Sequence, residues 1–515
     1  MRNAAGREIP ATIPGYKEIK PYAGPFATKP DGRMAGAKLT AAYPGMTKLL
    51  PSIEAAVEAA GLQDGMTISF HHGLRNGDAV MNAVIPVIAR RGIRGLKLAP
   101  SSFLDTNDVL IPYFEQGVIV AAETSGLRNR LGQYLTTTKL EKPTIIRSHG
   151  GRVRAIECGE LHIDVAFIAA PTCDTCGNIN GVEGPAACGS MGYAMVDSRF
   201  ADKVVAITDN LVDHPLCPIS IPQHQVDFIV KVDSIGDPKG ISTGALRLTS
   251  NPRDLRLAQL AAKVIERSGY FRNGFGMQLG AGAASVGAGK YLRETMLRDK
   301  ITANFANGGI VGPFCDLLDE GLIKTLFDVQ SFDARSIQSI RDNPRHQEYD
   351  CSFYANPWNK GALVNQLDFV VLGATEVDVN FNVNVLTDSN GIMMGASGGH
   401  CDASAGAKVT IIVAPLLRGR LPMILDDVQT IITPGETVDV IVTERGVAIN
   451  PKRLDLIENL KNSGLPLMSI HELRDLAYEL SGKPMPIRMT DEIVGVVEYR
   501  DGTVIDVIRK PVVLR

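Results

Sequence analysis

The sequence predicts an α/β fold built from two tandem, duplicated domains with mainly parallel sheets and helical crossovers. Three observations lead to this prediction. Apolar strand patterns alternate with amphipathic helix patterns, two strand-and-loop segments recur in the same order in the two halves, and glycine supplies 51 of the 515 residues. Alternating strands and helices are typical of parallel sheets, and abundant glycine indicates many tight turns and close backbone approaches.

The chain begins with a segment that has neither a helical nor a strand period. Residues 1–45 are rich in Pro, Gly and Lys, so we expect an extended arm that wraps the body or a neighbouring subunit. The pattern then changes, and helix, strand, helix and strand are predicted in turn at 49–62, 66–70, 79–92 and 95–102. This order is the unit of a parallel sheet.

The second half repeats the first. Residues 163–180 and 367–384 align through Asp164 and Asp368. The alignment superimposes two further pairs, Asn178 with Asn382 and Asn180 with Asn384. A duplicated domain explains this order better than one large sheet. We expect a boundary between Thr243 and Arg253, and therefore an N-terminal domain at 46–248 and a C-terminal domain at 249–515.

Composition and charge argue against a nucleic-acid-binding, membrane-spanning or secreted protein. The net charge of −3 gives no general attraction to nucleic acid or to an anionic membrane. No apolar run approaches the roughly 20 residues that a membrane helix needs, and the first 20 residues lack the apolar core of a signal peptide. A cytoplasmic protein with no nucleic-acid or membrane partner is the expectation.

The eight cysteines are scattered, and we expect them to be reduced. Cys173 and Cys176 form a CxxC motif, but we find no second pair and no two histidines at the spacing that a structural zinc site needs. A coincidence within a loop is the favoured interpretation, and no metal site is predicted. The chain also has no GxSxG elbow, no HExxH motif and no P-loop.

Two glycine-rich segments are the main candidates for a site at the carboxyl ends of strands. Their glycines let backbone N–H groups approach a substrate or a developing oxyanion. The candidate residues are Gln278, Gly280 and Gly282 in residues 277–289, and Gly395, Ser397, Gly398, Gly399 and His400 in residues 395–408. A dinucleotide-binding loop is disfavoured in the first segment, because the third glycine and an acidic ribose partner are missing.

Two further segments, 303–310 and 69–78, also follow or contain apolar strands. Their candidates are Asn304, Asn307 and Gly308 in the first, and His71, His72 and Arg75 in the second. Adjacent histidines beside an arginine could hold an anion, or could simply bond to loop carbonyls. The segment 149–152 (HGGR), which contains His149 and Arg152, is a similar candidate, and Arg147 lies just before it.

Several long motifs resemble the citrate lyase alpha subunit family. They are GLQDGMTISFHH, SHGGRVRAIECGELHIDVAF, VDVNFNVNVLTDSNG, GASGGHCDASA and IIVAPLLRGRLP. The resemblance runs from about residue 46 to the end. A weaker one links the second half to acetyl-CoA hydrolases and transferases, and together they imply that both domains have the CoA-transferase fold.

The weaker resemblance lacks one residue, a glutamate that is the nucleophile of the acetyl-CoA hydrolase and transferase group. In that group a glutamate next to the segment matching ITANFANGG carries CoA as a thioester. The corresponding position here is assigned to Ala303. The citrate lyase resemblance implies a route without such a nucleophile, in which a citrate carboxylate attacks an acetyl thioester and the freed thiolate attacks the mixed anhydride. Glu376, beside the strand that carries Asn384, is a fallback nucleophile or a buried structural carboxylate.

The resemblance also implies the partners. They are citrate, an acyl carrier protein (the gamma subunit), a citryl lyase beta subunit and further copies of this chain. No cofactor is expected on this chain, since acetyl-CoA or the carrier's prosthetic-group thioester is a substrate. Three carboxylates should require arginine forks, and Arg75, Arg147 and Arg152 are the candidates. Alternatives are a CoA-transferase or thioester hydrolase acting on another carboxylate through a glutamate, and a non-catalytic scaffold of the complex.

Overall fold

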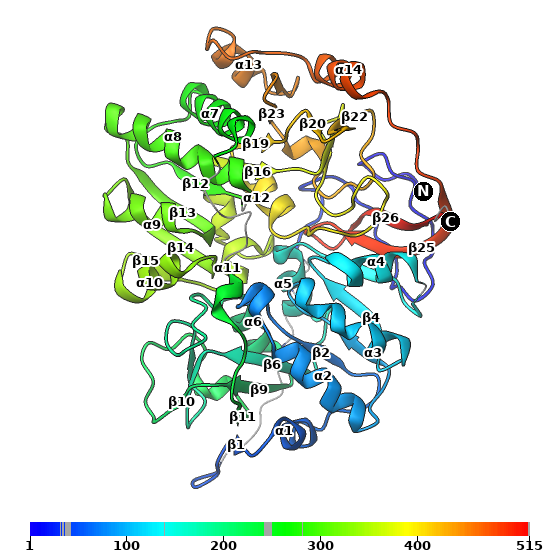
Figure 1. The fold of residues 1–515 in the computed structure, drawn as a ribbon, viewed down its shortest axis with the longest axis vertical. Helices are drawn as coiled ribbons and strands as arrows, with labels where there is room; N and C mark the ends of the chain where they lie inside the picture. The colour runs from blue at the N-terminus through cyan, green and yellow to red at the C-terminus, as the bar shows by residue number, and fades with distance from the viewer. Residues whose placement is uncertain are drawn as a thin grey trace.

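A computed structural model describes residues 1–30, 32, 36, 43–138, 140–241, 250–280 and 282–512. It contains two large sheets, each flanked by helices, stacked end to end with the C-terminal strands at one side (Figure 1). This arrangement confirms the predicted mainly parallel α/β architecture. No helix in the described part of the chain has the length and apolar character required to cross a membrane.

The first sheet has ten strands within the described residues, and all neighbours are parallel except the last pair. In spatial order they are β1 (Leu49–Leu50), β11 (Phe228–Lys231), β9 (Lys203–Thr208), β6 (Val165–Ala170), β2 (Thr67–Ser69), β3 (Leu96–Leu98), β4 (Ile119–Thr124), β5 (Thr144–Ile146), β25 (Met489–Glu498) and β26 (Val504–Pro511).

The second sheet has eight strands in the part of the chain that is described, and only its last pair is antiparallel. In spatial order they are β15 (His346–Glu348), β14 (Ile323–Ser331), β13 (Ala303–Ile310), β12 (Gly276–Leu279), β16 (Phe369–Gly373), β19 (Val409–Val413), β23 (Val440–Val442) and β24 (Val447–Ile449). Small sheets join β10 (Leu211–Val212), β7 (Thr172–Asp174) and β8 (Ile179–Asn180); β18 (Val383–Asn384), β17 (Glu376–Asp378) and β22 (Ile424–Leu425); and β20 (Leu417–Arg418) with β21 (Leu421–Pro422).

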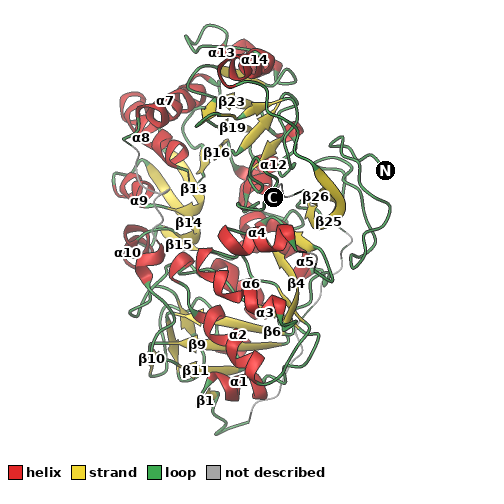
Figure 2. Ribbon diagram, turned by 45° about the vertical axis from the view of Figure 1, so that its right-hand side comes forward, coloured by secondary structure: helices red, strands yellow, loops and turns green. Residues whose placement is uncertain are grey.

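Helices cover the sheets on both sides (Figure 2). Those of the N-terminal half are α1 (Ile53–Ala59), α2 (Val80–Arg90), α3 (Ile111–Glu115), α4 (Asn129–Thr137), α5 (His149–Glu157) and α6 (Gly192–Phe200). Those of the C-terminal half are α7 (Pro252–Arg267), α8 (Ala283–Asp299), α9 (Gly312–Asp319), α10 (Ala334–Asp342), α11 (Cys351–Ala355), α12 (His400–Gly406), α13 (Leu454–Leu460) and α14 (Ile470–Ser481). Between the domains, α11 packs against α5 and α6, and α12 packs against α5.

The duplication is visible in the order of the strands. The series β11-β9-β6-β2-β3-β4-β5 recurs as β23-β19-β16-β12-β13-β14-β15. The paired residues recur as well: Asn178 Nδ2 donates to Asp174 Oδ2 at 2.8 Å, and Asn382 Nδ2 donates to Asp378 Oδ2 at 3.0 Å. Each pair closes the turn that follows a buried strand, so the repeated Asp and Asn letters mark one local structure used twice.

The end of the chain differs from the predicted division. The boundary region Thr243–Arg253 lies mostly outside the described residues, which resume at residue 250. Residues 489–511, predicted as part of the C-terminal domain, instead form the hairpin β25–β26, and β25 pairs with β5 of the first sheet. The alternating pattern of this hairpin specifies strands, but only the open edge of β5 determines where they pair.

The N-terminal arm lies along this same hairpin. Asn3 Nδ2 donates to the carbonyl oxygens of Val504 and Ile505 at 3.1 and 2.8 Å. Val504 exchanges backbone bonds with Lys20 and Tyr22. The arm therefore covers the edge of the first sheet within its own chain, which is a common way of protecting an exposed strand.

Candidate functional site

A cavity of about 290 Å³ opens between the two domains, where the carboxyl ends of their parallel strands face each other. The N-terminal domain contributes loops after β2, β3 and β4 and the first turns of α5 and α6, through His72, Arg75, Ser102, Ser125, Arg128, His149 and Tyr193. The C-terminal domain contributes the ends of β12, β13, β14 and β16, helix α11 and the loop before α12, through Gln278, Gly280, Gly309, Gln330, Tyr354, Gly373 and Ser397–His400. Strand ends of this kind are the usual site in α/β folds.

Two arginines give the cavity its charge. Arg75 and Arg128 form no ion pair with any described residue, and no described lining residue is an aspartate or glutamate. Burial and the nearby Arg128 lower the pKa of Arg75 to about 10. The Arg75 guanidinium lies 4.6 Å from the centre of the Phe332 ring, which comes from the other domain. Two partly buried cations without a carboxylate partner favour an anionic ligand.

The imidazoles of the cavity are neutral near pH 7. Burial lowers the pKa of His149 to about 3 and that of His400 to about 4, and burial together with neighbouring positive groups holds the pKa of His72 well below its usual value. His400 Nε2 donates to the Gly373 carbonyl at 3.0 Å, so its Nδ1 accepts from the Thr433 hydroxyl at 2.7 Å. These rings can therefore contribute hydrogen bonds and shape to the cavity, but no positive charge.

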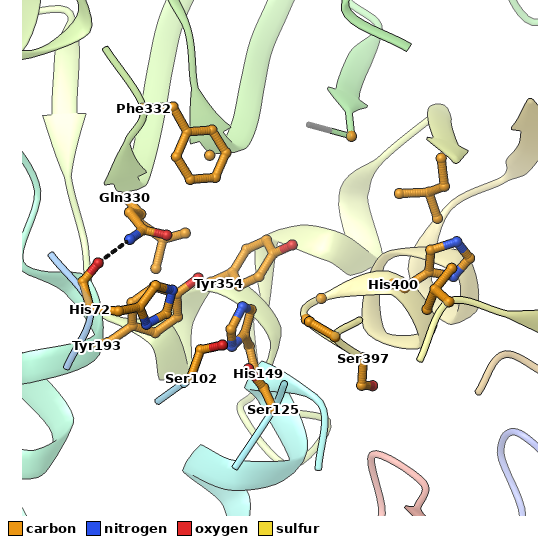
Figure 3. Close-up of a pocket in the computed structure, with 18 of the residues that line it drawn as sticks. His72, Ser102, Ser125, His149, Tyr193, Gln330, Phe332, Tyr354, Ser397 and His400 are labelled. Atoms are coloured by element: carbon orange, nitrogen blue, oxygen red, sulfur yellow. Dashed lines mark hydrogen bonds between the residues drawn. The ribbon is translucent and has the colours of Figure 1, made fainter. Parts of the chain in front are cut away.

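The rings of His72, Tyr193 and His149 form one wall of the cavity, with His400 across from them (Figure 3). The His149 and Tyr193 centres are 4.5 Å apart, and those of His72 and Tyr193 are 5.1 Å apart. His72 Nδ1 lies 2.6 Å from Ser101 Oγ, which fixes its ring, and Gln330 Nε2 donates to the His72 carbonyl at 2.8 Å. The wall is thus held by contacts from both domains.

The loop before α12 supplies backbone donors. Ser397 N donates to Ser125 O at 2.7 Å and His149 N donates to Gly398 O at 2.8 Å, so two backbone bonds hold this loop against the first domain. Gly398 has a φ of +52°, which glycine adopts readily. The N–H groups of Gly398 and Gly399 donate to no described residue. Both residues line the cavity, so these N–H groups are candidate donors to a ligand.

Eight residues predicted as site residues line this cavity: His72, Arg75, Gln278, Gly280, Ser397, Gly398, Gly399 and His400. One of them lacks its predicted role as a donor. The Gly280 N–H donates to Val371 O at 2.7 Å and is therefore not free. Gln278 is better placed, because its Nε2 donates to the Tyr354 hydroxyl at 2.9 Å while its Oε1 is buried without a partner.

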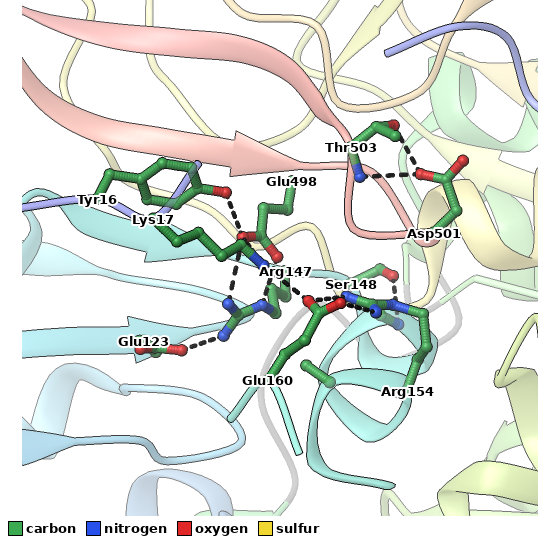
Figure 4. Close-up of polar contacts among 12 residues, drawn as sticks. Tyr16, Lys17, Glu123, Arg147, Ser148, Arg154, Glu160, Glu498, Asp501 and Thr503 are labelled. Carbon is green, nitrogen blue, oxygen red and sulfur yellow. Dashed lines mark hydrogen bonds and ion pairs between the residues drawn. The ribbon is translucent and has the colours of Figure 1, made fainter. Parts of the chain in front are cut away.

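Of the three candidate arginines, only Arg75 lines the cavity. Arg152 forms two 2.8 Å bonds with the Asp197 carboxylate and one with Ala99 O. Arg147 bonds to Glu498 at 2.6 Å and to Glu123, beneath the arm residues Tyr16 and Lys17 (Figure 4). Buried charges need such partners, so both arginines are committed to structure and neither lines the cavity.

The other predicted residues lie outside the cavity as well. His71 is buried behind its neighbour, Gly282 caps the start of α8, and Gly308 lies against the Gln278 side chain. Asn304 accepts a 2.9 Å bond from Lys324 on the surface. The remaining ones are the fully buried Asn307 and the tightly packed Gly395.

Glu376 and Asn384 bond to each other instead of facing the cavity. Glu376 Oε2 accepts from Asn384 Nδ2 at 2.8 Å and from Gln429 N at 3.1 Å. The carboxyl lines a separate cavity beside Arg7 and Tyr478, and burial raises its pKa. Neither Glu376 nor Asn384 lines the cavity that contains Arg75 and Arg128.

The position assigned to the missing nucleophile must also be revised. Ala303 begins β13, whereas Gly309, near its other end, lines the cavity. Six residues of strand separate the two by about 20 Å. The absence of a nucleophilic carboxylate therefore rests on the composition of the described lining and not on Ala303.

Several lining residues were missed from the sequence. Arg128 follows β4 in the same way that Arg75 follows β2, so the strand-end rule could have identified it. His149, by contrast, belongs to the candidate segment His149–Arg152; it begins α5 after β5 and lines the cavity. Tyr354 and Tyr193 carry no local signal, because they enter the cavity only through packing of α11 and α6 between the domains.

Comparisons with known proteins agree with this architecture. Residues 46–511 match the model of the family described as citrate lyase, alpha subunit (CitF). The citrate lyase alpha chain of Klebsiella pneumoniae is 51% identical over 492 residues, which cover 96% of each chain. The crystal structure of the citrate lyase alpha subunit of Streptococcus mutans in complex with citrate has a TM-score of 0.96 at 48% identity and covers 99% of this chain and 100% of that one.

A more distant likeness concerns the fold alone. The structure of a Pseudomonas malonate decarboxylase hetero-tetramer in complex with malonate matches at a TM-score of 0.63 and 16% identity, and the match covers 84% of this chain and 86% of that one. The two domains have a CoA-transferase-like fold. With a matching family model over most of its length and relatives at about half identity, the chain belongs to the citrate lyase alpha subunit family.

Proposed function

We propose that this chain transfers an acyl carrier thiol from acetate to citrate, converting an acetyl thioester and citrate into a citryl thioester and acetate through a mixed anhydride. The carrying observation is the composition of the inter-domain cavity: two unpaired arginines, two free glycine N–H groups and no described carboxylate. Family membership and the relative solved in complex with citrate support the choice of acid.

Arg75 and Arg128 are the proposed carboxylate forks. Each guanidinium presents parallel N–H donors that match a carboxylate. They follow the ends of β2 and β4, the two strands on either side of β3, in the loops that carry His72 and Ser125. A tricarboxylate can place two groups on this pair and direct the third across the cavity. Gln330 and Ser102 add polar contacts on the same side.

The reaction needs two acyl transfers. In the first, a citrate carboxylate oxygen bonds to the acetyl carbonyl carbon, a tetrahedral oxyanion forms, and the C–S bond breaks to release the thiolate. In the second, the thiolate bonds to the citryl carbonyl of the anhydride, and acetate leaves with the bridging oxygen. No proton needs to be transferred, because carboxylate and thiolate exchange roles. Holding the reactants together can contribute roughly 7–11 kcal/mol.

The N–H groups of Gly398 and Gly399 are the proposed oxyanion donors. They adjoin His400, whose ring is fixed by Gly373 and Thr433. A good backbone donor contributes about 3–4 kcal/mol to such a transition state. The lowered pKa values of His149 and His400, about 3 and about 4, make their imidazoles weak bases for activating water, which disfavours hydrolysis of the anhydride.

No described residue of the lining is a carboxylate, which also separates this route from one that uses a glutamate. Glu376, the fallback nucleophile, lines a different cavity. Under the proposal the physiological thiol belongs to a small acyl carrier protein, CoA thioesters substitute for it, and a beta subunit cleaves the citryl thioester. We place the activity in the cytoplasm, where the eight free cysteines stay reduced.

A single-turnover experiment with citrate labelled with heavy oxygen in its carboxylates tests the route. Excess chain is mixed with acetyl-CoA and labelled citrate, and acetate is analysed by mass spectrometry. The direct route places one citrate oxygen in the first acetate formed. Unlabelled first-turnover acetate together with citryl-CoA would instead indicate an enzyme carboxylate, acetate labelled from heavy water would indicate hydrolysis, and no acetate at all would favour a scaffold.

A further inference from the structure

A cluster of metal-binding side chains lies in the N-terminal domain, outside the inter-domain cavity. We infer that Asp174, Cys176 and His214 form a binding site for a zinc-class divalent ion. One oxygen, one sulfur and one ring nitrogen from these residues all lie within 4.8 Å of one another. They join the turn between β7 and β8 to the loop after β10, and the site is independent of the proposed transfer reaction.

The geometry is close to that of a tetrahedral site. His214 Nδ1 lies 3.1 Å from Asp174 Oδ2. Zinc bonds of about 2.0–2.3 Å place neighbouring ligand atoms roughly 3.3–3.8 Å apart, so small side-chain movements suffice. Asp174 is fully buried, Cys176 is partly buried and the His214 side chain is 44% exposed. An ion can therefore enter from solvent past the imidazole and meet a fixed carboxylate.

Comparison of the two copies of the domain shows which residues around Asp174 belong to the shared structure and which do not. Asp174 accepts bonds from Asn178 and from Leu216 N, and Asp378 accepts the equivalent bonds from Asn382 and Val428 N. The same scaffold therefore stands in both copies. Two residues after each aspartate, the first copy has Cys176 and the second has Asn380. Two residues before Leu216 the first copy has His214, and two residues before Val428 the second copy has Asp426. The thiol and the imidazole are additions to the first copy.

The ligand chemistry selects the ion. A thiolate and an imidazole favour Zn²⁺, whereas Mg²⁺ and Ca²⁺ prefer oxygen ligands. On binding, the Cys176 thiol loses one proton to solvent and its sulfur bonds to the ion. His214 moves its ring proton from Nδ1 to Nε2 by exchange with solvent, so the ion takes the place of the proton now shared with Asp174. One proton is released per ion bound.

The CxxC motif thus contributes through its second cysteine. Cys173 is fully buried and its Sγ–H is directed at the Asp174 carbonyl, 3.3 Å away. A feature missed from the sequence is the spacing His214-x-x-Cys217, which puts an exposed thiol three residues after the histidine. Cys217 is not among the ligand atoms that lie within 4.8 Å of one another, so a water molecule completes the fourth position. Lys48 lies within electrostatic range of the cluster and opposes a cation there.

Binding of cobalt and zinc to the intact chain tests this site. Co²⁺ should produce the thiolate-to-cobalt charge-transfer absorption of a cysteine ligand, at one ion per chain, and Zn²⁺ should abolish it by competition. In Cys176→Ser the absorption should disappear. In Cys176→Ser and His214→Asn, zinc affinity measured by equilibrium dialysis should fall more than the roughly 10- to 100-fold that loss of an outer partner costs.

A second cluster in the same domain provides the matched control. His162, Asp164 and Asp202 also lie within 4.8 Å of one another but contain no sulfur. His162→Asn should leave the cobalt absorption and zinc affinity unchanged, and Lys48→Gln should tighten zinc binding. Thermal denaturation verifies that each variant is folded. A wild-type chain without the charge-transfer band, or a folded Cys176→Ser that binds zinc as tightly as wild type, would overturn the inference.

Discussion

Replacing Arg128 by glutamine should weaken citrate binding without destabilising the protein. Arg128 has no acidic partner among the described residues, and its charge depresses the pKa of Arg75. The substitution therefore removes a repulsion in the empty protein and a charged hydrogen-bonding fork in the citrate complex. Most arginine substitutions at partly buried positions lose stability and binding together, so opposite changes would be diagnostic of a ligand-binding charge.

The magnitude follows from the contacts that are lost. Hydrogen bonds to a charged group contribute about 1.5–3 kcal/mol, which corresponds to roughly a 10- to 150-fold rise in the Kd for citrate. The gain from relieved repulsion is smaller, between zero and about 1 kcal/mol, because both guanidinium groups are only partly buried. The thermal midpoint of the citrate-free protein should therefore stay the same or rise slightly.

Isothermal titration with citrate and thermal denaturation without it measure the two quantities. Arg130→Gln is the matched control, because Arg130 lies in the first turn of α4, two residues after the N-cap Arg128, but is exposed and does not line the cavity. Unchanged citrate affinity in Arg128→Gln would refute the assignment of this arginine. A fall in its thermal midpoint well beyond that of Arg130→Gln would show that Arg128 has a structural role instead.

Three further predictions concern stability. Burial raises the pKa of Glu348, which accepts bonds from Met191 N and Ser220 across the domain interface, to about 7. Between about pH 4.5 and 7 the folded state therefore binds more protons than the unfolded state, and stability falls as the pH rises through this range. Glu348→Gln should reduce that fall by at most about 3 kcal/mol, measured by comparing denaturation midpoints at low and high pH. Gly399→Ala puts a Cβ 2.3 Å from the Tyr354 hydroxyl and should cost about 1–3 kcal/mol, whereas Gly373→Ala, which adds a Cβ with open space around it, should leave the midpoint unchanged; equal losses would contradict the packing argument. Asn3→Ala removes the two bonds that the Asn3 side chain donates to the hairpin and should cost about 1–3 kcal/mol, with the exposed Arg2→Ala as the reference that shows no comparable loss.

The architecture was predictable because it is repeated and local. Alternating apolar segments identify strands, and the Asp–Asn spacing identifies the same turn in two places, which the bonds of Asp174 and Asp378 explain. The pairing of β25 with β5 was not predictable in this way. It joins residues about 350 positions apart (Gly495 with Thr144), and nothing within either segment specifies the partner.

The site residues likewise include some that local sequence predicts and some that it does not. Gly398 could be named from the sequence because close backbone approach requires glycine, and His72 because it follows the apolar strand β2 closely; both line the cavity. The role of a charged residue was harder to predict, because Arg75, Arg147 and Arg152 look alike in sequence. Only the structure shows that Glu498 neutralises Arg147 and that Asp197 neutralises Arg152. Whether an arginine is available to a ligand depends on acids that lie elsewhere in the chain.

The return of β25 and β26 to the first sheet has a consequence for how the chain is made. On the ribosome, β5 is synthesised early, yet its neighbour emerges only when almost the whole chain has been translated. Until then the nascent N-terminal domain has an unpaired strand edge, and Arg147 lacks the Glu498 that neutralises it. A fragment that ends between the domains would keep that liability permanently. Because the arm and the hairpin are in contact, moving the hairpin to the front of the chain by circular permutation should allow the N-terminal domain to be produced alone.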